Sequence, residues 1–293
     1  MEERQNIPSY SDNLEKRKLE EIEHSRRRRK ILQGFERHID INRTDDIKNI
    51  DSMIRDKDLF NYHFSNTKFY SIIHSSEEYQ YSWLRDKCKP GVKVLDFACG
   101  NGENGIFAAG YGADVIGIDI SPEGIENANL NAKQTGVADR CRFEVMDGEN
   151  MEFPDNMFDL GVEYGALHHV DLEKAMSELC RVLRPNGEMI CVEALKHNPL
   201  IHWYRKRTPH LRTGWEVEHI LGIDDLNVVR KYFQEINVRF FHLTVLAAVP
   251  FRKTIIFKPL RILLDLIDKI ILGNQFIGKY AWIMVFTMSK PKK

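Results

Sequence analysis

A glycine-rich turn in the first third of the chain has the spacing of a ligand-binding loop. Gly100, Gly102 and Gly105 follow the apolar run 92–97 and precede a stretch with helical periodicity. Glycine lets a ligand lie directly against the backbone, and the following helix offers free N–H groups and the positive end of its dipole. The turn therefore predicts a site for a nucleotide-like ligand.

Two acids indicate which ligand this is. Asp119 ends the next expected strand, 113–119, where a carboxylate can bind both hydroxyls of a ribose. Asp96 precedes the first glycine, where a dinucleotide site usually has a small apolar residue beneath the pyrophosphate. A carboxylate there repels phosphate and attracts an ammonium. S-adenosylmethionine carries an ammonium and a sulfonium and has no phosphate, so it fits these acids better than a nicotinamide dinucleotide.

Five motifs together carry a family resemblance. They are residues 94–102, 117–121, 146–149, 158–170 and 181–187. Their order and spacing resemble class I S-adenosylmethionine-dependent methyltransferases over about residues 76–195. Within that class the chain looks most similar to small-molecule enzymes of the ubiquinone/menaquinone C-methyltransferase type.

The expected fold is α/β. Strands at 92–97, 113–119, 141–146, 157–163 and 187–195 alternate with helices at 102–110, 122–135 and 171–183, which predicts a parallel sheet with helices on both faces. A helix at 224–234 and strands at 236–246 and 280–286 follow. The resemblance implies a Rossmann-like, doubly wound, seven-stranded sheet whose last strand is antiparallel.

The resemblance also implies a set of cofactor-binding residues. In the family, the acid at the position of Asp147 accepts the adenine amino group, whereas Glu163 and Tyr164 stand where a small polar residue is common. The expected cofactor residues are Asp96, Ala98, Gly100, Asn101, Gly102, Asp119, Ile120, Ser121, Asp147, Gly148, Glu149, Glu163 and Tyr164.

Candidate catalytic residues follow the fourth strand. His168 or His169 could act as a general base, although paired histidines also simply cap a strand and begin a helix, and Glu163 is a rival base. No metal site is expected. Aromatic and basic residues near the functional edge predict the acceptor pocket: Tyr70, Tyr79, His169, His202, Tyr204 and Arg205.

The flanking segments suggest three regions. Residues 1–57 form a charged extension with a helix at 14–37, and 58–90 form an aromatic-rich lid or a helix packed on the sheet. The core, 91–293, carries insertions at 196–222 and 247–278. The extension is expected to cover the active site or serve a partner subunit, with the cations at 26–30 on a solvated helix face.

The second insertion contains an amphipathic helix after Pro259. We expect this helix to be a cap helix or a homodimer face. Contact with an anionic membrane or a lipid-linked substrate is the less favoured interpretation.

Composition excludes several functions. The 293 residues have a formal net charge of −1, which gives no general attraction for nucleic acid. Five cysteines show neither paired nor zinc-ligand spacing, the first forty residues hold no secretory signal, and no apolar run spans a bilayer. A cytoplasmic protein is expected.

The predicted function is S-adenosylmethionine-dependent methylation of oxygen, nitrogen or carbon on a small-molecule acceptor. An NAD(P)-dependent oxidoreductase and a non-catalytic donor-binding subunit are the alternatives.

Overall fold

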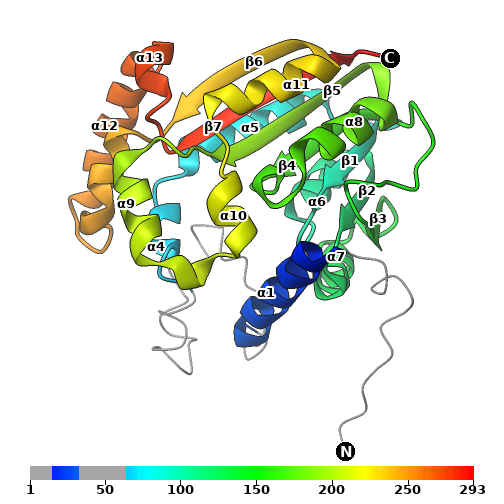
Figure 1. Ribbon diagram of the computed structural model, residues 1–293, viewed down its shortest axis with the longest axis horizontal. Helices are drawn as coiled ribbons and strands as arrows, with labels where there is room; N and C mark the ends of the chain where they lie inside the picture. Colours follow the sequence, from blue (N-terminus) through cyan, green and yellow to red (C-terminus); the bar gives the residue numbers. More distant parts are fainter. Residues whose placement is uncertain (1–14, 33–63) are drawn as a thin grey trace, which may run out of the picture.

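The computed structural model describes residues 15–32 and 64–293. In this part a seven-stranded sheet runs through the centre, with helices on both faces (Figure 1). The strand order is β3-β2-β1-β4-β5-β7-β6, and β7 is antiparallel to both of its neighbours while the other paired strands are parallel. The predicted doubly wound sheet with an antiparallel last strand is confirmed.

The first half of the sheet closely follows the expected boundaries. Its elements are β1 (Lys93–Phe97), α6 (Glu103–Gly110), β2 (Asp114–Asp119), α7 (Pro122–Thr135), β3 (Cys141–Val145), β4 (Phe158–Tyr164), η2 (Leu167–His169), α8 (Leu172–Val182) and β5 (Leu183–Ala194). Helix α7 begins at Pro122 because Ser121 accepts a hydrogen bond from the N–H of Gly124 at 3.2 Å.

The second half contains the two segments that were expected to be insertions, 196–222 and 247–278. Its elements are α9 (Pro199–Arg207), η3 (Pro209–Leu211), α10 (Gly214–His219), η4 (Ile223–Asp225), α11 (Leu226–Tyr232), β6 (Phe233–Phe241), η5 (Thr244–Phe251), α12 (Phe257–Ile271), α13 (Gln275–Gly278) and β7 (Ile283–Pro291). The expected strand 236–246 is wrong at its end. Asp268 accepts hydrogen bonds from the N–H groups of Leu243, Thr244 and Val245, and this holds the chain in a 3-10 helix.

Within residues 15–32 and 64–92, three helices precede the sheet: α1 (Lys16–Leu32), α4 (Thr67–Tyr70) and α5 (His74–Lys87). The expected helix 14–37 is therefore observed from residue 16 to 32, and residues 33–37 lie outside the described part. Helix α1 lies beside α7, near the carboxyl ends of the first strands (Figure 1).

The core has two main layers because side chains alternate along each strand. Leu95 and Phe97 of β1 belong to the cluster that includes residues of α8 and α11. Val94 belongs to the opposite cluster, with residues of α5 and α6. All parallel strands deliver their carboxyl ends to one edge, which positions the site.

Candidate active site

A cavity of about 460 Å³ lies at the carboxyl edge of the sheet. One end is formed by the turns after β1, β2 and β3, and the other by α4, α9 and the residues just before β7. Helix α1 covers the cavity. The expected cofactor residues that line it are Ala98, Gly100, Asn101, Asp119, Ile120, Ser121, Asp147, Gly148, Glu149 and Tyr164.

Asp119 is held in position by the backbone. Its Oδ2 accepts the N–H of Gly100 at 2.9 Å, and its Oδ1 accepts the N–H of Ser121 at 2.8 Å. A carboxylate can accept about four hydrogen bonds, so each oxygen retains capacity for a ribose hydroxyl. Gly100 has φ +56°, and no atom lies within 4 Å of the place where a Cβ would stand. The turn therefore leaves room for an adenosine ligand beside Asp119.

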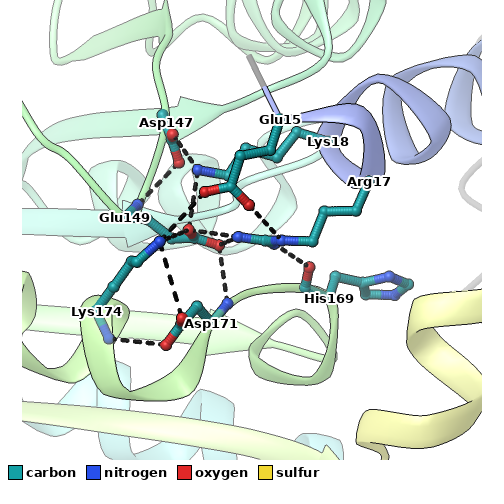
Figure 2. Close-up of polar contacts among 8 residues, drawn as sticks. All are labelled: Glu15, Arg17, Lys18, Asp147, Glu149, His169, Asp171 and Lys174. Carbon is teal, nitrogen blue, oxygen red and sulfur yellow. Dashed lines mark hydrogen bonds and ion pairs between the residues drawn. The ribbon is translucent and has the colours of Figure 1, made fainter.

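Asp147 and Glu149 are paired with two cations of α1 (Figure 2). Lys18 Nζ lies 2.5 Å from Asp147 Oδ2 and 2.9 Å from Glu149 Oε2. Arg17 donates to both oxygens of Glu149 at 2.6 Å. Although burial alone would raise the pKa of Glu149, its hydrogen bonds to Arg17, Asp171 and Lys18 lower the value. This end of the cavity is therefore closed by ion pairs.

Other contacts join α1 to the glycine turn and α7. Arg26 lies 2.5 Å from Glu123, and Arg29 donates a hydrogen bond to Asn101. Arg28 also lines the cavity. The expectation that residues 26–30 form a solvated face is therefore wrong for these three arginines. The expectation that the extension covers the active site agrees with the position of α1.

Three expected cofactor residues do not line the cavity, namely Asp96, Gly102 and Glu163, and the first two support the glycine turn. Asp96 is buried, and its Oδ2 accepts the N–H of Gly105 at 2.8 Å, at the start of α6. Burial raises its pKa to about 7, although the Gly105 hydrogen bond acts in the opposite direction. Gly102 is also buried, with φ +83°, and a Cβ there would lie 2.8 Å from Phe143 Cζ. Both residues shape the turn, so the expected contact of Asp96 with an ammonium has no support.

His168 is the better oriented of the two histidines. Its Nδ1 lies 2.7 Å from Oε2 of Glu193, a buried residue of β5, and its ring lines the cavity. Burial alone would raise the pKa of Glu193, but His168 and its hydrogen bonds lower it. The sequence analysis did not identify Glu193 as a functional residue. The feature that could have indicated it is that Glu193 is the one acid in the apolar stretch 189–194.

His169 has a different environment. Its Nδ1 lies 3.0 Å from Oε2 of Glu21 on α1. Burial alone would lower the pKa of His169, but the hydrogen bond and charge of Glu21 raise it to about 9. His169 is therefore protonated at neutral pH, which makes it a poor base.

Glu163 does not line the cavity and is fully buried. Burial and the nearby charge of Glu193 raise the pKa of Glu163 well above its usual range, which favours the uncharged form. Its Oε1 accepts the N–H of Ala166. Glu163 therefore lies near the carboxyl end of β4, outside the lining of the cavity.

The end of the cavity beside α4 and α9, where the acceptor is expected, is aromatic. The Phe69 ring lies 4.9 Å from Tyr204 and 5.7 Å from Trp282, edge to face in both pairs. Tyr70 also lines this end. Tyr79 does not, because its ring packs on Phe241 at 5.8 Å.

His202 is exposed on α9 and does not line the cavity either, so the expectation of an acceptor contact is wrong for both Tyr79 and His202.

Three arginines line the same end: Arg28, Arg205 and Arg212. Arg205 donates to the carbonyl of Leu195 at 2.9 Å, and burial lowers its pKa to about 10. Arg212 pairs with Glu216 at 3.2 Å. Arg28 lies 5.0 Å from the Phe64 ring centroid, and no carboxylate lies within 4.0 Å of it among residues 15–32 and 64–293. The predicted contact of Arg205 with the acceptor is compatible with this position.

A family model described as "Methyltransferase domain" matches residues 88–234, which is half of the chain. The chain belongs to this methyltransferase domain family. The matched region begins just before β1 and ends in β6, so it contains the glycine turn, Asp119, Asp147 and both histidines.

Curated relatives of this methyltransferase chain act on different small molecules. A sterol 4-C-methyltransferase of Caenorhabditis elegans is 31% identical over 137 residues, which cover 46% of this chain and 40% of that protein. A demethylmenaquinone methyltransferase of Symbiobacterium thermophilum is 36% identical over 113 residues, covering 37% of this chain and 45% of that protein. The match thus spans less than half the length of these relatives.

Solved structures share the methyltransferase fold. The YcgJ protein of Bacillus subtilis superposes with a TM-score of 0.50 at 20% identity, over 74% of this chain and all of that chain. A geranyl diphosphate C-methyltransferase of Streptomyces coelicolor gives 0.51 at 16% identity, over 80% of this chain and 88% of that chain. The sequence resemblance to class I methyltransferases is confirmed, and only a distant likeness supports the quinone subtype.

Within residues 15–32 and 64–293, no group of three or more potential ligands could hold a metal ion. In the same ranges, no helix has the length and apolar character needed to cross a bilayer.

Proposed function

We propose that this protein transfers the methyl group of S-adenosylmethionine to a small-molecule acceptor. The observation that carries the proposal is that a single cavity has one end lined by the glycine turn and acids and another end lined by aromatic side chains. The turn held by Asp119 suits an adenosine ligand, and the aromatic end beside Tyr204 and Trp282 suits a flat or apolar acceptor.

At the donor end, Asp119 would hold the ribose hydroxyls, and Asp147 would accept from the adenine amino group. The backbone of the turn at Gly100 leaves space for the methionine part. When bound, S-adenosylmethionine supplies an electrophilic methyl group on a positively charged sulfur. The main task of this chain is then to align the acceptor and exclude water. Helix α1, paired to Asp147 and Glu149 through Arg17 and Lys18, provides that exclusion.

His168 is the candidate base for an acceptor that must lose a proton. With Nδ1 directed at Glu193, Nε2 lies 4.0 Å from Oε1 of Glu216, beyond hydrogen-bond distance, and would accept a proton from the acceptor. The carboxylate of Glu193 would stabilise the imidazolium that forms. Glu193 therefore acts as a positioning residue for His168.

The acceptor is proposed to carry an anionic group. Arg28 and Arg205 lie among aromatic rings at the acceptor end, and neither has a carboxylate within 4.0 Å in the described part of the chain. A phosphate or carboxylate on the acceptor would pair with these guanidinium groups. The sterol, quinone and isoprenoid acceptors named for similar proteins also support an apolar body.

The test has two stages. Calorimetry with S-adenosylmethionine and with NAD(P) measures donor choice, and tight binding of a nicotinamide dinucleotide alone would support the oxidoreductase instead. Transfer of label from methyl-labelled donor into a small-molecule extract then measures catalysis. Donor binding without any labelled product would support a non-catalytic subunit.

A further inference from the structure

The segment from η5 to α13 exposes an unusually apolar surface. Ile255 is 96% exposed, Ile270 is 80% exposed and Phe276 is 82% exposed. The other exposed apolar residues of the segment are Phe251, Ile256, Ile262, Leu263, Leu266, Ile267, Ile277 and Tyr280. We call this set the α12–α13 patch. Contiguous exposed apolar surface of this kind marks an interaction site.

Helix α12 is apolar on two sides. Its inner side packs on the core through Leu260 and Leu264, and Asp268 there holds the start of η5. The outer residues Ile262, Leu266 and Ile270 recur every four positions and lie on the opposite side of the helix. A helix that only covered the core would be polar on this outer side. The expectation of a simple cap helix therefore accounts for one side of α12 alone.

The exposed charges within the segment that carries the patch are positive. Arg252, Lys258 and Lys269 are exposed, and Lys279 lies beside Tyr280. The only acids between residues 243 and 293 are Asp265 and Asp268.

Both acids face inward. Asp265 pairs with Arg261 and accepts from Ser75, each at 3.4 Å, and Asp268 is buried against the start of η5. Apolar side chains flanked by unopposed cations match the chemistry of an anionic lipid surface.

A second copy of the chain fits the α12–α13 patch less well than an anionic lipid surface does. A two-fold contact through the α12–α13 patch would bring its cations toward the same cations of the other copy. No acid of the segment is exposed to offset that repulsion. Anionic lipid headgroups would offset it while the apolar side chains enter the acyl region.

We propose that the α12–α13 patch binds the surface of an anionic membrane. The two helices lie together at one end of the molecule (Figure 1). The segment is joined to the acceptor end of the cavity, because Asn198 at the start of α9 donates to the carbonyl of Tyr280 at 2.7 Å and Trp282 lines the cavity. Docking would bring this end of the cavity toward the lipid.

Co-sedimentation of the full chain with vesicles tests the proposal. Vesicles of phosphatidylcholine alone are compared with vesicles in which about a third of the lipid is phosphatidylglycerol. The protein is expected to sediment with the anionic vesicles and only weakly with the neutral ones, and added salt should release it. No sedimentation of the folded protein with anionic vesicles would overturn the proposal.

Substitutions in the α12–α13 patch test whether this surface makes the contact with the vesicles. Ile270→Ser with Phe276→Ser should weaken partition by about tenfold or more, and Lys258→Gln with Lys269→Gln by about tenfold. All four side chains are exposed, so folding should not change. The controls are Leu130→Ser and Lys133→Gln, exposed positions on α7.

Equal partition of all variants would overturn the proposal. So would a dimer in ultracentrifugation that Ile270→Ser dissociates while vesicle binding is absent. Neither readout involves S-adenosylmethionine, so failure here is distinct from failure of the proposed function.

Discussion

Lys18 Nζ lies 2.5 Å from Oδ2 of Asp147, the acid expected to bind the adenine amino group. Lys18 is 8% exposed, and its pKa is raised because the hydrogen bonds and charges of Asp147 and Glu149 outweigh burial. One residue of the N-terminal extension therefore contacts two residues of the cofactor end. Helix α1 lines the cavity, so we expect the donor to enter or leave as α1 separates from these acids.

Removing Lys18 should loosen this closure. In Lys18→Ala, Asp147 and Glu149 lose a shared cation, so α1 should separate more often. We expect dissociation of S-adenosylmethionine, measured by stopped-flow fluorescence, to accelerate by about tenfold. Trypsin should also cleave faster at Arg26 to Arg29. The control is Lys133→Ala on the surface of α7, and equal rates in both variants would refute the role of Lys18.

Asp119 should dominate donor affinity. Asp119→Asn keeps the size of the side chain but replaces one carboxylate oxygen with a donor. The Kd for S-adenosylmethionine should rise by about 100-fold, because two hydrogen bonds to a charged acceptor are weakened. Since Asp119 also accepts from Gly100 and Ser121, the melting temperature is recorded in parallel. Asp139→Asn, at an exposed position before β3, is the control. Unchanged affinity would contradict the ribose assignment.

The two glutamates behind the histidines should respond differently. Glu163→Gln should leave transfer activity within about twofold, because Glu163 is buried outside the cavity lining and an amide oxygen can still accept from Ala166. Glu193→Gln removes the carboxylate that orients His168, and the rate should fall by about 100-fold for an acceptor that must lose a proton. At alkaline pH, where such an acceptor loses its proton to solvent more readily, the transfer rate of Glu193→Gln should recover in part. A severe loss in Glu163→Gln would return Glu163 to the list of bases.

Several of these features could be predicted from the sequence because they depend on neighbours in the chain. The glycine turn, Asp119 and the Ser121–Pro122 start of α7 are local, so pattern and propensity sufficed. The pairing of Lys18 with Asp147 joins residues 129 positions apart, and no local pattern carries that information. Tyr79 illustrates the same limit. An aromatic residue in the expected lid packs on Phe241, because its direction from α5 depends on tertiary packing.

Stability should depend on pH through His169. Its folded pKa of about 9 exceeds the unfolded value of 6.5, so its pairing with Glu21 contributes fully below about pH 6.5 and is lost as the pH rises through 9. The free energy of unfolding in urea should therefore fall between about pH 6.5 and 9. Glu21→Gln should flatten this part of the profile. An identical slope in that variant would assign the pH dependence to other groups.

Gly102 should be required for the turn itself. It has φ +83°, and a Cβ would lie 2.8 Å from Phe143 Cζ and 3.0 Å from Ala128 Cβ. Gly102→Ala should therefore lower the free energy of unfolding by about 2 to 4 kcal/mol, through backbone strain and overpacking together. Gly100→Ala is the matched comparison. Gly100 also has positive φ, but no atom lies within 4 Å of its Cβ position, so only the backbone cost of about 1 kcal/mol applies. Equal losses in urea unfolding would show that contact with Phe143 contributes nothing, and a larger loss at Gly100 would contradict the packing described for the turn.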